Sequence, residues 1–169
     1  ESIRAIHAAL DLGVNFFDTA ANYGAGHSEK VLGKALKSKR DQVVIATKFG
    51  HLVDEEKKSV YGDNDQIIKN VRTDVENSLR RLQTDHIDLY QMHHIDRDAS
   101  WEEVWQAMEV LVQQGKVIYV GSSNFAGWQL QKAIDLSQRM GWESFACLQP
   151  LYNLLDRATE WELIPVCLN

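Results

Sequence analysis

Several short apolar segments of the chain end in a polar side chain that could take part in chemistry. These side chains are Asp18, Lys48, His93, the pair Ser123 and Asn124, and Gln149. They lie far apart in the sequence, but the carboxyl ends of parallel strands meet at one face of a sheet. We therefore expect these groups to converge on a single site.

The set Asp18, Tyr23, Lys48 and His93 suggests proton donation to a carbonyl group. A phenol with the ordinary pKa of about 10 is a poor proton donor near neutral pH, and a nearby ammonium group makes the phenolate more stable. We expect Lys48 to supply that charge, and Asp18 to hold the ammonium by a charge-assisted hydrogen bond. His93 could donate a hydrogen bond to the substrate oxygen.

This general acid chemistry suits a reaction in which a carbonyl becomes an alkoxide and is then protonated. No side chain supplies a hydride, so a nicotinamide cofactor is implied. Taken singly, each residue also has an ordinary structural interpretation: a turn or cap for the Asp, a solvated Lys, a packed Tyr, a core His. The joint spacing and the common face favour the chemical interpretation of the set.

The elements that must position these groups alternate between strands and helices. Short runs rich in Val, Ile, Phe and Tyr predict strands at 14–18, 43–48, 86–93, 116–123 and 144–149. Apolar stripes with helical spacing predict helices over 3–10, 68–82 and 101–112, and a weaker pattern predicts one over 158–169. Ser100 and Asp65 are candidate N-caps, and Gly13 and Gly115 candidate helix ends.

Alternating strands and helices indicate a parallel sheet, either in a (β/α)8 barrel or in an open doubly wound fold. The regular units without a reversal of direction favour the barrel. Gly24-Ala25-Gly26 lacks the third glycine of a dinucleotide fingerprint, so a bound dinucleotide would lie at the barrel mouth rather than in a Rossmann crevice.

Composition narrows the class of protein. The 169 residues are 44% hydrophobic and 25% charged, with a net charge of −6, which is typical of a globular domain and excludes disorder, collagen and coiled coil. The absence of a basic block argues against nucleic acid or a membrane surface as partner. The sequence has only two cysteines, Cys147 and Cys167, and no apolar run of membrane-spanning length. We therefore expect a cytoplasmic protein.

The segments that carry these residues resemble the aldo-keto reductase superfamily, in its microbial and potassium-channel-β-subunit-like branches. They are GVNFFDTAANYGAGHSEKVLGKAL, VVIATKFG, DHIDLYQMHHID, GKVIYVGSSNF and LQPLYNLLDR. The resemblance implies a (β/α)8 TIM barrel that reduces small-molecule aldehydes and ketones with NADPH and without a metal. It implies that Tyr23 donates the proton, that Lys48 and Asp18 tune it, and that His93 orients the carbonyl. By the same resemblance, the cofactor would be bound by Asp18, Ser123, Asn124 and Gln149.

The resemblance covers about five βα units, corresponding to strands two to six of the barrel. We expect residues 1–169 to be a single barrel domain, incomplete at both ends and part of a longer protein. Three alternatives stay open: an NADPH-binding regulatory barrel that serves mainly as a partner of another protein, a barrel portion whose site residues persist without activity, and a metal-dependent barrel hydrolase. No feature of the sequence indicates an oligomeric state.

Two local features complete the expectations. His93 and His94 are adjacent on a predicted strand, so they should point to opposite faces and not form a metal site. The charged stretch over 49–64 is expected to be a solvated loop or a lid over the substrate mouth.

Overall fold

The main element of the fold is a curled parallel sheet. The computed structural model describes residues 1–61, 67–94 and 100–169. Its main sheet has the strand order β1-β2-β5-β6-β7. The strands are β1 (Phe16–Asp18), β2 (Val44–Phe49), β5 (Ile87–Met92), β6 (Val117–Ser123) and β7 (Phe145–Gln149). Each strand joins the same edge as the one before, whereas a doubly wound sheet reverses its order, so the strand order confirms the expected barrel segment.

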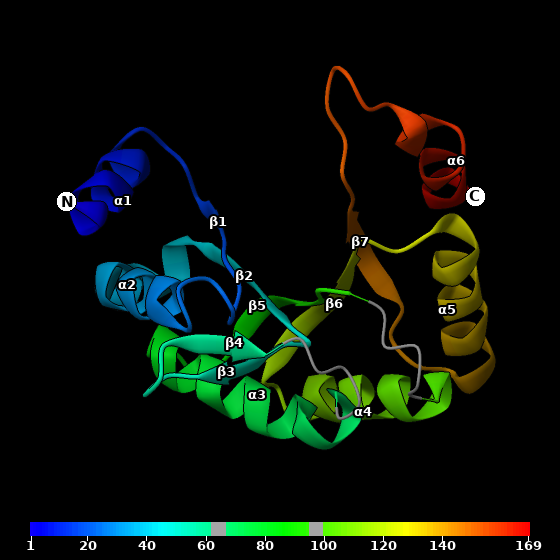
Figure 1. Cartoon of the computed structure of the whole chain (residues 1–169), viewed down its shortest axis with the longest axis horizontal. Coiled ribbons are helices and arrows are strands. Elements are labelled where there is room, and N and C mark those ends of the chain that lie inside the picture. Colours follow the sequence, from blue (N-terminus) through cyan, green and yellow to red (C-terminus); the bar gives the residue numbers. More distant parts are fainter. Residues whose placement is uncertain (62–66, 95–99) are drawn as a thin grey trace.

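Helices follow the strands and cover one side of the sheet. They are α1 (Ser2–Asp11), α2 (His27–Leu36), α3 (Ile67–Leu82), α4 (Trp101–Gln113), α5 (Gly127–Met140) and α6 (Leu163–Leu168), with 3-10 turns at Lys37–Gln42 and Ala158–Glu160. Figure 1 shows α2, α3, α4 and α5 in an arc around the sheet, with α1 beside the β1 edge and α6 beside α5. The expected strands and helices are confirmed, except that the weak C-terminal helix is split into a 3-10 turn and α6.

Local signals at the helix ends act as expected where the structure describes them. The Ser100 side chain accepts a hydrogen bond from the Glu103 backbone N–H at the start of α4 (3.2 Å). After α4, Gly115 has a left-handed φ of 70°. The Gly115 N–H donates a hydrogen bond to the Val112 carbonyl, and the Lys116 N–H donates one to the Leu111 carbonyl. This is the Schellman motif that a C-terminal glycine favours. The other predicted N-cap, Asp65, lies outside the described residues.

The hydrophobic core lies between the sheet and the helix arc. Buried aliphatic side chains of α3 and α4 pack against the outward-facing residues of β2, β5 and β6. Aromatic contacts join the layers: Phe49 stacks on Tyr90 (4.7 Å between ring centroids), and Trp105 meets Phe145 edge-on (4.6 Å). Because alternate strand residues face this core, the intervening ones must face the opposite side of the sheet, where the polar strand ends lie.

The segment after β2 differs from its expectation. The stretch over 49–64 was predicted as a solvated loop or a lid, but its described part contains a hairpin of β3 (Leu52–Asp54) and β4 (Ser59–Tyr61). Glu55, at the turn, forms ion pairs with Lys30, Arg80 and Arg81 of the neighbouring helices. The prediction of a solvated loop is wrong for residues 50–61, because ion pairs with α2 and α3 hold the turn in place, whereas the lid stays a prediction. Residues 62–64 lie outside the described part.

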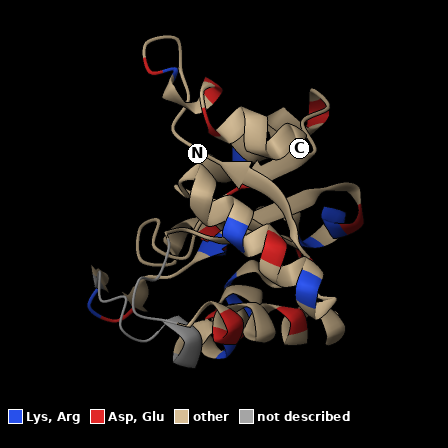
Figure 2. Cartoon of the chain, turned by 90° about the vertical axis from the view of Figure 1, so that its right-hand side faces the viewer, with Lys and Arg blue, Asp and Glu red and all other residues tan. Residues whose placement is uncertain are grey.

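Charge is mixed over the helices. Along α5 the charged residues Lys132, Asp135 and Arg139 alternate in sign, and Figure 2 shows positive and negative segments mixed over the helices on this side. Within the described ranges, no helix is both long enough and apolar enough to cross a membrane.

Candidate active site

The expected polar residues lie at one edge of the sheet. Asp18, Ser123 and Gln149 are the last residues of β1, β6 and β7, Lys48 is next to last on β2, and His93 follows β5 directly. The pairing of neighbouring strands sets the position of these residues along the strand direction. Lys48 is in register with Gln91, and Ser123 is in register with Gln149. The parallel order therefore brings together the groups predicted from the sequence.

Lys48 and Asp18 form the centre of the site. The Lys48 Nζ donates to Asp18 Oδ2 (2.6 Å), to Asp18 Oδ1 (2.9 Å) and to the Thr19 carbonyl (3.0 Å). The Lys48 side chain is 1% exposed and the Asp18 side chain 28%. An ammonium buried to this degree needs a partner, and all three of its N–H donors have an acceptor here. Alternation along β2 explains the placement, because the adjacent Thr47 bonds instead to Glu29 of α2 (2.6 Å).

Tyr23 lies in the turn between β1 and α2, next to this ion pair. The Lys48 Nζ is 5.3 Å from the centroid of the Tyr23 ring. The ring is also edge-on to that of His93, with the centroids 6.0 Å apart. Tyr23 is 43% exposed, so part of this residue lies at the surface of the site. Asp18 and Tyr23 line a hollow of about 600 Å³ between α1, β1 and α2.

A glycine fixes the shape of the Tyr23 turn. Gly26 has a φ of 84°, and a Cβ there would lie 2.7 Å from Cδ of the Arg81 side chain. Only glycine combines this left-handed backbone with such a close approach. The Thr19 hydroxyl further ties the start of the turn to the Ser28 hydroxyl (2.8 Å). Gly26 thus shapes the turn that carries Tyr23.

His93 is surrounded by other imidazoles. Its ring stacks on His94 (4.8 Å, interplanar angle 2°) and meets the His51 ring edge-on (5.0 Å). Burial first, then the His51 and His94 rings and Lys48, lower the pKa of His93 to about 4. His93 is thus neutral at pH 7 and has one ring N–H to donate.

The prediction that His93 and His94 point to opposite faces is wrong. Strand β5 ends at Met92, so the alternation of an extended strand no longer applies to the two histidines. Among the described residues, no group of three His, Cys, Asp or Glu side chains has an arrangement that could hold a metal ion.

The second group of predicted residues adjoins His93. The Asn124 Nδ2 donates to the His93 carbonyl (3.1 Å) and to the Ser123 hydroxyl (3.1 Å). The Ser123 hydroxyl in turn donates to the Gln149 carbonyl (3.0 Å). The Ser123 hydroxyl and the Asn124 side-chain amide thus lie side by side, next to the backbone carbonyl of Gln149, and together these groups offer both donors and acceptors. This donor set fits the carboxamide of a nicotinamide, which needs both.

The structure adds Gln91, which the sequence reasoning missed. It is 2% exposed, its Nε2 donates to Asp18 Oδ1 (3.3 Å), and its Oε1 accepts from the Cys147 thiol (3.6 Å). Burial, followed by the Asp18 carboxylate, raises the pKa of that thiol, so it stays a donor. Gly121 leaves the room for these side chains, since a Cβ there would lie 2.9 Å from Cys147 Sγ. The signal in the sequence that could have identified Gln91 is a polar residue on an apolar strand, two positions before His93.

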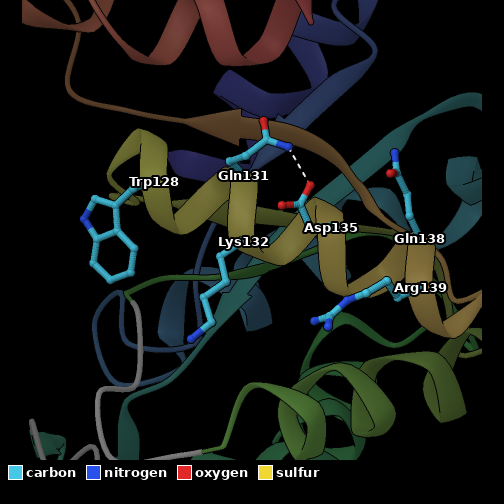
Figure 3. Close-up of a pocket in the computed structure, with 6 residues that line it drawn as sticks. All are labelled: Trp128, Gln131, Lys132, Asp135, Gln138 and Arg139. Carbon is cyan, nitrogen blue, oxygen red and sulfur yellow. Dashed lines mark hydrogen bonds between the residues drawn. The ribbon is translucent and has the colours of Figure 1, made fainter.

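A larger hollow, of about 850 Å³, lies elsewhere. Figure 3 shows that its lining side chains all come from the outer face of α5: Trp128, Gln131, Lys132, Asp135, Gln138 and Arg139. Lys132 lies over the Trp101 ring and Gln131 bonds to Asp135, so these polar groups already have partners on the helices. We therefore place the candidate active site at the strand ends.

The fold and the site together define a parallel β/α barrel segment with a Lys–Asp pair beside a tyrosine and a histidine. The family model for the Aldo/keto reductase family matches residues 1–169. The chain belongs to this family, whose members are (β/α)8 barrels.

Among curated proteins, the chain is 43% identical to the uncharacterized oxidoreductase YrpG of Bacillus subtilis, over 97% of this chain and 52% of that protein. It is 39% identical to the aldo-keto reductase YhdN of Bacillus subtilis, over 97% of this chain and 47% of that protein. It is 34% identical to versiconal hemiacetal acetate reductase of Aspergillus parasiticus, over 100% of this chain and 54% of that protein. The chain thus spans about half the length of the curated relatives it matches.

Proposed function

We propose that the protein is an NADPH-dependent reductase of small-molecule aldehydes and ketones. The observation that supports this most directly is the contact set of Lys48, Asp18, Tyr23 and His93 at the strand ends. Family membership and relatives named as oxidoreductases and reductases support the same class of reaction. The cysteines Cys147 and Cys167 are unpaired, in keeping with a reducing cytoplasm as the expected location.

In this proposal each residue has a defined task. Tyr23 donates its hydroxyl proton to the oxygen of the reduced carbonyl, and the Lys48 ammonium stabilises the phenolate that remains. Asp18 holds the ammonium in place with two hydrogen bonds. Neutral His93 donates a hydrogen bond to the carbonyl oxygen and so orients the substrate toward Tyr23.

Four residues would hold the cofactor. Ser123, Asn124 and Gln149 would bind the carboxamide of the nicotinamide, and Asp18 would contact the cofactor from the neighbouring strand. Bound NADPH would supply the hydride, which no side chain can provide. The choice of NADPH over NADH follows the family resemblance, as does the absence of a metal.

Replacement of the proton donor tests this function in the protein at its full natural length. Tyr23→Phe should lower the rate of NADPH oxidation with an aldehyde panel by roughly 10²- to 10⁴-fold, the usual contribution of a general acid. Tyr119→Phe, an exposed tyrosine on β6, is the matched control and should keep the rate. Normal turnover by Tyr23→Phe would refute the assignment of the acid. Tight NADPH binding with no turnover in the unmodified protein would favour the regulatory barrel instead.

A further inference from the structure

The three histidines beside Tyr23 form a cluster that the proposed reaction does not use in full. We call His51, His93 and His94 the histidine cluster. His93 and His94 stack face to face, and His51 meets both edge-on, with centroid distances of 5.0 Å and 5.3 Å and interplanar angles of 75° and 77°. Edge-to-face contact is a favoured geometry for aromatic rings. His51 therefore closes the side of the stack that both other rings share.

His51 reaches the cluster from a different part of the chain. His93 and His94 follow β5, whereas His51 lies between β2 and β3, directly before the hairpin. The position of the His51 ring therefore depends on how firmly the hairpin is held. Within the hairpin, Leu52 pairs with Tyr61 and Asp54 with Ser59.

Glu55 fixes the hairpin to two helices. Its carboxylate binds Lys30 of α2 (2.6 Å), and Arg80 (2.8 Å) and Arg81 (3.0 Å) of α3. The hydrogen bond from Lys30, together with those from Arg81 and Arg80, lowers the pKa of Glu55 to about 2. A second contact holds the turn itself, because Asp54 accepts hydrogen bonds from the backbone N–H groups of Glu56 and Lys57.

We propose that His51 is a positioning residue for His93, presented by the β3–β4 hairpin and held there by Glu55. His51 fixes the His93 ring edge-on to Tyr23 and keeps water from its side. The inference rests on the proposed function, in which His93 orients the carbonyl. The proposal adds His51, and the β3–β4 hairpin that presents it, to the site residues at the ends of the strands.

Two physical effects follow from this arrangement. The titratable groups that face His93 are Asp18, Tyr23, Lys48, His51 and His94. Of these groups, the Asp18 carboxylate favours the protonated form of His93, whereas the His51 and His94 imidazoles and the Lys48 ammonium disfavour it. Burial opposes it most, and His51 contributes to that burial as well as to the repulsion between like charges. Removal of His51 should thus make His93 easier to protonate and free its ring to turn.

The direct test is the protonation of His93, followed by NMR in the protein at its full natural length, which needs no turnover. In His51→Gln the midpoint of the His93 titration should rise by about one pH unit toward the ordinary value of 6.5. His86→Gln is the matched control, because His86 lies just before the opposite end of β5, and it should leave the midpoint unchanged. With an aldehyde substrate, His51→Gln should also lower kcat/KM several-fold at pH 7 with an unchanged Kd for NADPH.

A double-mutant cycle separates positioning from general damage. Glu55→Gln should shift the His93 midpoint in the same direction as His51→Gln, and the two changes together should shift it no further than His51→Gln alone. An unchanged His93 midpoint in folded His51→Gln would overturn the proposal, as would fully additive shifts. Failure of the proposed function is a different result: Tyr23→Phe would turn over normally while the His93 midpoint still responded to His51.

Discussion

Replacement of Lys48 by methionine tests how the buried ammonium acts on Tyr23. Methionine keeps most of the apolar stem and removes the charge, which lies 5.3 Å from the centroid of the tyrosine ring. With an effective dielectric constant of about 20, Coulomb's law gives about 3 kcal/mol for a unit negative charge on that ring at this distance. The Asp18 carboxylate, on the same ammonium, cancels part of this field. We therefore expect Lys48→Met to slow aldehyde reduction by roughly 10- to 100-fold.

The assay is single-turnover oxidation of NADPH with saturating aldehyde, which isolates the chemical step from product release. Lys34→Met, an exposed lysine on α2, is the matched control and should keep its rate. Because Lys48→Met also leaves Asp18 without its cation, the double variant with Asp18→Asn checks whether a stability loss contributes. If folded Lys48→Met binds NADPH normally and reacts within about twofold of the unmodified protein, the electrostatic reasoning is refuted.

Three further predictions concern stability, each measured by urea unfolding. Arg81→Met leaves the fully buried Glu29 carboxylate without its partner at 2.5 Å and should cost about 3–5 kcal/mol, most of which Glu29→Gln in the same chain should restore. Burial raises the pKa of Asp74 from 3.8 to about 6 in the folded state. Between pH 3.8 and pH 6 the unfolded state therefore binds fewer protons than the folded state, and the free energy of unfolding falls as the pH rises. Asp74→Asn should remove that fall and stabilise the protein at pH 7 by about 3 kcal/mol; an unchanged pH profile would contradict this. Gly33→Ala places a Cβ 2.5 Å from the Leu82 carbonyl oxygen, so α2 and α3 must separate and stability should drop by more than about 1 kcal/mol.

The sheet and much of the site were predictable because they depend on short-range patterns. Apolar runs indicate where the strands lie, and the polar residue at the end of each run indicates the edge of the sheet at which that strand ends. Asp18 and Lys48 could be paired on this basis, since neighbouring parallel strands place their ends together. The contact of Asn124 with the His93 carbonyl follows from the same geometry.

The errors arose where the regular pattern stops. Strand alternation was extended to His93 and His94, although the last residue of β5 is Met92 and the chain bends after it. The hairpin was missed because its stability depends on Glu55 meeting cations of two helices. Pairings of that kind are set by tertiary structure and leave no periodic signal in a charged segment.

The order of strands in the sheet has a consequence for synthesis of the chain. Among the described residues, each strand of the main sheet after β1 pairs with the strand of that sheet that precedes it in the chain, so each unit can add to a formed edge as it leaves the ribosome. The site would then assemble in steps. The Lys48–Asp18 pair closes when β2 joins β1, the stacked histidines arrive with β5, and the link between Ser123 and Gln149 forms only when β7 adds to β6. The growing protein would thus form the Lys48–Asp18 pair before Ser123, Asn124 and Gln149, the residues proposed for the nicotinamide carboxamide, have been made.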